Sequence, residues 1–86
     1  MERAGSIDPL DRRMLLEATM SIERFATVLT TLRTSKGLTQ EQLAKRAKVS
    51  RGYLADLEAG HRKNPSVAAL RRLAKALGVP VAELLG

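Results

Sequence analysis

The run SRGYLADLEAG, from Ser50 to Gly60, carries the side chains best suited to molecular recognition. If this run is helical, Leu54 and Leu57 share one face, and Arg51 and Asp56 point away from it. An arginine guanidinium can donate two hydrogen bonds to O6 and N7 of guanine, and an aspartate can accept one from the amino group of cytosine. We therefore expect Arg51 to read a base. Asp56 either reads a base or repels phosphate and orients Arg51.

Gly52 shares this exposed face, where it either allows a close approach or weakens the helix by about 1 kcal/mol relative to alanine. Other polar side chains nearby suit a phosphate backbone. Gln40 opens the preceding segment, where unpaired backbone N–H groups and the positive end of a helix dipole favour phosphate. Tyr53 either contacts phosphate or sugar, or packs against that segment. The candidate backbone contacts are Thr39, Gln40, Ser50, Tyr53, Arg62, Lys63 and Asn64.

Two short helices must position these side chains. Thr39 and Gln42 form a Thr-x-x-Gln capping box at the start of the first, and its inner face holds Leu43, Ala44 and Ala47. Ser50 caps the second, which ends at Gly60. A helix, a tight turn and a second helix can place the second one in the major groove of DNA.

The flanking segments are helical as well. Apolar residues at helical spacing predict a helix over residues 22–34, capped by Ser21 and ended by Gly37 in a left-handed conformation. Further helices are expected from about Ser66 to Gly78 and over residues 80–85. Asp8 and Pro9 favour a short extra helix through about residue 19. The expected fold is all-α, with residues 1–19 as an extension and residues 20–86 as a five-helix domain.

The composition of the chain excludes several classes of protein. Eighty-six residues suit one small domain, and the absence of cysteine removes disulfides and thiolate zinc sites. His61 is the only histidine, so a surface role is expected rather than a metal site. Neither a membrane span nor a signal peptide is recognisable, which favours a cytoplasmic protein. Without a Gly-rich phosphate loop or clustered inward carboxylates, we expect neither an enzyme nor a cofactor.

The net charge of +6 is unevenly distributed. Residues 1–35 contain five basic and five acidic residues, whereas residues 36–63 contain seven basic and three acidic ones. Residues 64–86 contain three basic and one acidic. The excess therefore lies in and after the two-helix segment, which favours a polyanion such as nucleic acid; the alternative is a solvated, soluble surface.

Residues 21–86 resemble the helix-turn-helix domain of the Xre/Cro and lambda-repressor-like family. The matching runs are LTQEQLA at 38–44, VSRGYL at 49–54, LEAG at 57–60, NPS at 64–66 and LAKALGV at 73–79. The resemblance implies a compact five-helix domain that binds double-stranded operator DNA, usually as a dimer, and controls transcription. Restriction–modification controllers and phage-type repressors are comparable subtypes. The alternative is an antitoxin or adaptor whose main partner, such as a toxin, is another protein.

The resemblance also assigns structural roles. It implies an ion pair between Arg33 and Glu58 that braces the domain rather than contacting DNA. Lys48 stands where the family commonly has a left-handed glycine, which implies strain of about 1 kcal/mol and leaves the angle between the helices open. Pro80 replaces the usual capping serine and still suits a helix start.

A dimer interface is expected at the C-terminal end, where apolar residues are crowded. Residues 8–19 are a second candidate. A two-fold dimer would read half-sites about one helical turn apart. The candidate interface residues are Val79, Val81, Leu84 and Leu85.

Overall fold

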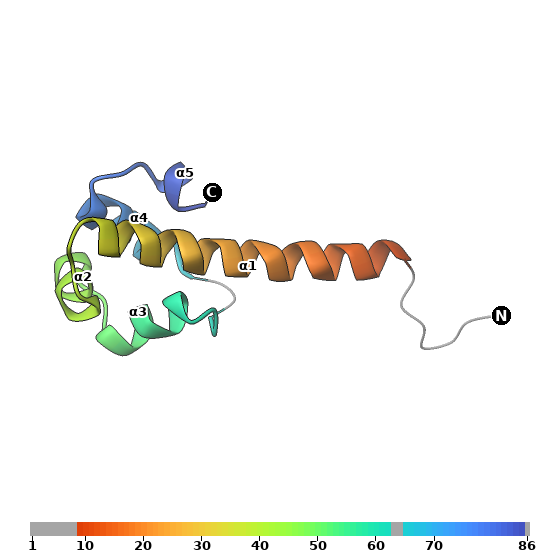
Figure 1. The fold of residues 1–86 in the computed structure, drawn as a ribbon, viewed down its shortest axis with the longest axis horizontal. Coiled ribbons are helices and arrows are strands. Elements are labelled where there is room, and N and C mark those ends of the chain that lie inside the picture. The colour runs from red at the N-terminus through yellow and green to blue at the C-terminus, as the bar shows by residue number, and fades with distance from the viewer. Residues whose placement is uncertain (1–8, 63–64, 86) are drawn as a thin grey trace.

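The computed structural model of the chain describes residues 9–62 and 65–85, with side chains from residue 22 onward (Figure 1). All of its regular elements in these ranges are helices, as the sequence predicts. They are α1 (Pro9–Ser35), α2 (Gln40–Ala47), α3 (Arg51–Glu58), α4 (Val67–Leu77) and α5 (Val81–Leu84). α3 and α5 both contact α1, and Figure 1 shows them on different sides of it.

The first helix differs from the prediction. We expected an extra helix to end near residue 19 and a new one to begin at Ile22, but α1 is continuous from Pro9 to Ser35. No glycine or proline follows Pro9 within this helix, and a serine inside a helix costs only a few tenths of a kcal/mol. Ser21 therefore does not interrupt it. In Figure 1 the first half of α1 extends beyond the other helices.

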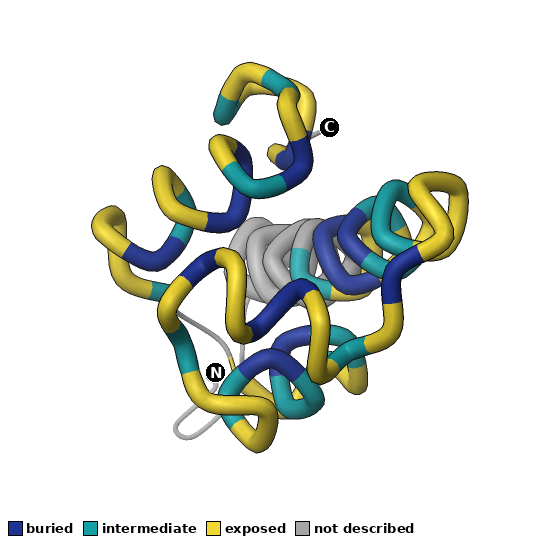
Figure 2. Tube along the Cα trace, turned by 90° about the vertical axis from the view of Figure 1, so that its left-hand side faces the viewer, coloured by how far each residue is buried: buried dark blue, intermediate teal, exposed yellow. Residues whose placement is uncertain are grey.

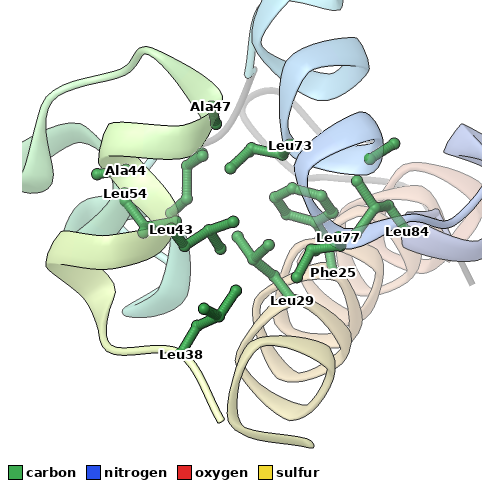
Figure 3. Close-up of a cluster of buried hydrophobic side chains, with 12 residues drawn as sticks. Phe25, Leu29, Leu38, Leu43, Ala44, Ala47, Leu54, Leu73, Leu77 and Leu84 are labelled. Carbon is green, nitrogen blue, oxygen red and sulfur yellow. The ribbon is translucent and has the colours of Figure 1, made fainter. Parts of the chain in front are cut away.

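The core is a single cluster of buried apolar side chains contributed by all five helices and by Leu38 in the first loop (Figure 3). Burying each large apolar side chain contributes roughly 1.5–3 kcal/mol, so these leucines hold the helices together. Figure 2 shows the same pattern along the chain, with buried stretches facing the centre and exposed stretches facing outward. The fully buried leucines are Leu29, Leu43, Leu54, Leu57, Leu73 and Leu84.

The ends of the helices follow the capping signals of the sequence. The Thr39 hydroxyl accepts from the backbone N–H of Gln42 at 3.0 Å, and the Gln42 side chain accepts from the N–H of Thr39 at 2.9 Å. This confirms the capping box. Gly37 is left-handed with φ +72°, also as predicted. The helix starts and stops in this part of the chain are therefore set by local chemistry.

Lys48 ends α2 in the left-handed region, with φ +58° and ψ +42°. Its backbone N–H donates to the carbonyls of Ala44 and Lys45, and the N–H of Val49 donates to the carbonyl of Ala44 at 3.0 Å. The turn therefore has the left-handed form that glycine usually supplies. It reverses the chain in three residues and brings the inner faces of α2 and α3 together.

Candidate nucleic-acid interface

The first turn of α3 presents its side chains to solvent. Leu54 and Leu57 are buried, whereas Arg51 and Gly52 are exposed. The Ser50 hydroxyl accepts from the N–H of Tyr53 at 3.0 Å and so caps the helix. The rigid packing of α3 against α1 and α2 thus leaves one arginine at an open helix end.

Arg51 lies beside the N-terminus of α2. Together with Thr39, Gln40 and Glu41 it lines a hollow of about 400 Å³ that also reaches Arg33. Thr39 and Ser50, which we expected at the DNA backbone, both use their hydroxyl oxygen to accept a capping hydrogen bond. Each hydroxyl hydrogen can still be donated. Both capping hydroxyls therefore keep a hydrogen that they can donate to a further acceptor.

Behind this hollow, Arg33 and Glu58 form the ion pair expected from the resemblance. The Arg33 Nε and Nη2 atoms donate to the two Glu58 carboxylate oxygens at 2.7 and 2.9 Å. The Arg33 Nη1 atom donates to the Leu38 carbonyl at 2.7 Å. The side chains are only 13% and 5% exposed. The bidentate bond joins the end of α1 to the end of α3, so it fixes the end of α3 against α1.

The pair shifts the pKa of both groups. The hydrogen bond to Glu58 raises the pKa of Arg33 above its ordinary value. Burial alone would raise the pKa of Glu58, but hydrogen bonds from Arg33 and Gln40 outweigh it and hold that pKa below its ordinary value. Both groups are therefore charged at neutral pH.

Gln40 is part of this network, which the sequence did not reveal. Its side-chain amide donates to the Glu58 carboxylate at 3.0 Å, so the carboxylate joins α1, α2 and α3. The bond uses one of the two amide hydrogens and leaves the carbonyl oxygen unused by it. Gln40 is half-buried at the start of α2. Its location still suits a phosphate contact, but its orientation is set by Glu58.

Asp56 lies five residues, or about 1.4 helical turns, after Arg51 and has no hydrogen bond or ion pair with it. Its carboxylate is 3.9 Å from the His61 ring, and its backbone carbonyl accepts from the N–H of His61 at 2.9 Å. The Asp56 side chain is half exposed. The arrangement gives no support to Asp56 as a residue that orients Arg51, and it leaves the carboxylate accessible.

Tyr53 connects α3 to the start of α4 rather than packing against α2 alone. Its hydroxyl accepts from the backbone N–H of Ser66 at 3.2 Å. The Arg62 guanidinium lies 4.5 Å from the centre of its ring, a cation–π contact. Neither contact has a signal in the sequence, because both depend on the path of the loop. Lys63 and Asn64, the other expected backbone contacts in this loop, lie outside the described residues.

The C-terminal residues divide into two groups. Leu84 is fully buried within the chain's own core, so the expectation that it lies in a dimer interface is wrong. Val79 and Val81 are half-buried against that core. Leu85 is 58% exposed, and so is Val67 at 63%, which the sequence analysis did not single out.

No group of three or more metal-ligating side chains occurs among the residues that the structure describes. None of the described helices is long and apolar enough to cross a membrane.

Comparisons with known proteins agree with this architecture. The model of the helix-turn-helix family HTH_3 matches residues 29–84. The chain is 52% identical over 54 residues to an uncharacterised HTH-type transcriptional regulator, y4dJ, of Sinorhizobium fredii, covering 63% of this chain and 69% of that one. It is 47% identical over 55 residues to the immunity repressor of Bacillus phage phi105, covering 64% of this chain. It spans only 38% of that repressor's length.

A solved structure shows the same fold. The restriction–modification controller protein C.AhdI from Aeromonas hydrophila superimposes with a TM-score of 0.70 at 40% identity. The match covers 73% of this chain and 94% of the controller. Because the family model matches more than half of the chain and these relatives are similar to it, the chain belongs to the helix-turn-helix family.

Proposed function

We propose that this protein is a sequence-specific regulator of transcription that binds double-stranded operator DNA as a dimer, with α3 in the major groove. The observation that carries the proposal is the exposed Arg51 on the first turn of α3. The Arg33–Glu58 pair holds the other end of this helix. The named functions of the relatives support transcriptional regulation, and a repressor and a restriction–modification controller are among them. Operator binding would place the protein in the cytoplasm.

Base reading is assigned to the exposed face of α3. Arg51 donates two hydrogen bonds to a guanine, and Asp56 accepts from a cytosine amino group. Gly52 has open space where a side chain would be, since an added Cβ would meet no atom within 4 Å. A base or sugar can therefore approach the backbone of α3 at Gly52.

Backbone binding is assigned to the donors around this face. Gln40 and the hydroxyls of Thr39 and Ser50 lie at helix starts, where the dipole favours phosphate. Tyr53 on α3 and Arg62 in the loop that follows α3 form a second group, joined by their cation–π contact. Lys63 and Asn64 belong to the same loop and are proposed with it. These contacts supply affinity and register without reading sequence.

Dimerisation is assigned to the C-terminal end, with a second copy of the chain as the occupant. Leu85 and the partly exposed Val79 and Val81 form the proposed contact. Two recognition helices related by a two-fold axis would read half-sites about one helical turn apart. Residues 8–19 remain the second candidate for this interface.

Selection of bound fragments from a pool of random duplex DNA tests the proposal. A regulator of this kind enriches one sequence with two related half-sites, and the enriched duplex is bound at least about a thousandfold more tightly than random DNA. If no sequence is enriched, and the affinity for DNA varies with salt concentration but not with sequence, the protein binds DNA non-specifically. This result would contradict the proposal.

A further inference from the structure

A basic hollow lies between the C-terminal ends of α2 and α4, away from the first turn of α3. Its volume is about 430 Å³. Four of its lining side chains are cationic and exposed, none is acidic, and the remaining two are alanines. We call this hollow the α2–α4 cleft and define it by Arg46, Lys48, Arg72 and Lys75.

Stabilisation of helix ends explains only part of this charge. Arg46 and Lys75 lie in the last turns of α2 and α4, where cations offset the helix dipole. Each helix end contributes roughly half a negative charge, about one in total, against four positive side chains. The ion pairs among the described residues are Arg33–Glu58 and His61–Asp56, and neither includes a residue of the cleft. A positive excess of about three charges therefore remains.

The α2–α4 cleft is continuous with the proposed DNA-binding face. Lys48 and Arg72 also line a neighbouring hollow of about 420 Å³. That second hollow is lined by Ser50, Tyr53 and Arg62, which are assigned to the DNA backbone. The basic surface thus runs from the start of α3, past the turn at Lys48, to the far end of α4.

We propose that the α2–α4 cleft binds phosphates of the same DNA outside the base pairs read by α3. This inference rests on the proposed function. A duplex carries about one negative charge per 1.7 Å of its axis, so a basic surface that continues past the operator meets a continuing row of phosphates. The exposed lysine and arginine side chains suit contacts that depend on charge and not on base sequence.

The salt dependence of binding tests the cleft. The selected duplex is used in two lengths, one trimmed to the selected base pairs and one with about ten further base pairs, or one helical turn, on each side. On the long duplex, Arg46→Gln and Lys75→Gln, which line only the cleft, should each reduce the magnitude of the negative slope of log K against log salt by about 0.9, the value for one lost phosphate contact. On the trimmed duplex, both variants should match the unmodified protein.

The chain offers matched controls. Arg71 and Lys45 are exposed, adjacent in sequence to Arg72 and Arg46, and outside the cleft lining. Arg71→Gln and Lys45→Gln should leave the slope unchanged on both duplexes. Equal losses in cleft and control variants, or equal losses on both duplex lengths, would overturn the proposal.

Two further measurements separate it from its alternatives. Tripolyphosphate binding that is abolished by Lys75→Gln, with no change in that variant's slope on the long duplex, would assign the cleft to a free phosphate compound and overturn the DNA assignment. Scrambling the selected base pairs tests the proposed function separately. Equal affinity for scrambled and selected duplex would refute sequence-specific reading, whereas the slope difference between cleft and control variants on long DNA would still support the cleft.

Discussion

Arg51 is the residue to which we assign base reading under the proposed function. It is exposed on the first turn of α3, whereas Leu54 and Leu57 of the same helix are buried. Under this proposal, replacing Arg51 with alanine removes two hydrogen bonds to one base pair and no core packing. We expect Arg51→Ala to weaken binding of the selected duplex by about 1–3 kcal/mol and to relax preference at one position. Affinities for duplexes with each base pair at that position provide the measurement.

Arg62→Ala is the comparison for this variant. Because we assign the charge of Arg62 to a phosphate contact, its replacement should weaken binding to all duplexes alike and reduce the magnitude of the salt slope by about 0.9. An Arg51→Ala protein that behaves in the same way, with equal loss on every duplex, has lost only a backbone contact. Arg51 would then be removed from the base-reading residues.

The Arg33–Glu58 pair predicts a dependence of stability on pH. The pKa of Glu58 is lowered in the folded protein from its ordinary value of 4.5. Its contribution is therefore complete above pH 4.5 and is lost as the pH falls through the folded pKa. The raised pKa of Arg33 has no effect in this range, because the guanidinium is charged throughout. Urea unfolding of the protein should show a loss of stability below pH 4.5 that Glu58→Gln lacks.

Removing the cation should be costly at neutral pH. Arg33→Ala leaves a carboxylate that is 5% exposed without its partner, and we expect a loss of about 3–5 kcal/mol in the free energy of unfolding. Matching acid sensitivity in the unmodified protein and in Glu58→Gln would show that other carboxylates dominate the pH response. The Arg33→Ala measurement would remain valid in that case.

At the scale of elements, the turn between α2 and α3 contains a local strain. Lys48 has φ +58°, which costs a residue with a Cβ roughly 1–2 kcal/mol. Lys48→Gly removes this cost but increases the entropy of the unfolded chain, so we expect a net stabilisation of about 0.5–1 kcal/mol. Lys48→Ala loses the same side-chain charge and keeps the strain. Thermal unfolding that ranks glycine no higher than alanine would contradict the strain.

The helix ends show what local sequence can predict. Thr39 with Gln42, and Gly37, act within one turn of their own helix, and their predicted roles are present in the structure. Ser21 failed as a boundary because a capping residue permits a helix start without requiring one, and no residue near it breaks the helix. A serine therefore predicts a helix start where the preceding residues leave the helical conformation, as at Ser50 after Lys48, and not within a continuous helix, as at Ser21.

Contacts across the fold could be predicted only in part. The family resemblance supplied Arg33–Glu58, but Gln40 in that network and the Tyr53–Ser66 contact depend on how separate helices meet. Leu84 was expected at a dimer interface because apolar residues are crowded at the C-terminal end. A helix of four residues is too short for the spacing of its apolar residues to distinguish a buried face from an exposed one. The structure, by placing α5 against α1 and α4, buries it.

At the scale of the whole molecule, the proposed function requires two copies of the chain to meet at the C-terminal end. Leu85 is 58% exposed and Leu84 is fully buried, although they are neighbours in sequence. Leu85→Asp places a charge on the proposed interface without disturbing the core, so it should shift sedimentation from dimer to monomer and leave the free energy of unfolding of the monomer nearly unchanged.

Leu84→Ala is the matched control, because it leaves a cavity inside each chain. It should cost about 2–5 kcal/mol of stability, and any loss of dimer should follow that unfolding. A dimer that withstands Leu85→Asp would move the interface to residues 8–19. A monomer at high concentration, with and without DNA, would refute dimeric operator binding, and α3 would then read a single half-site.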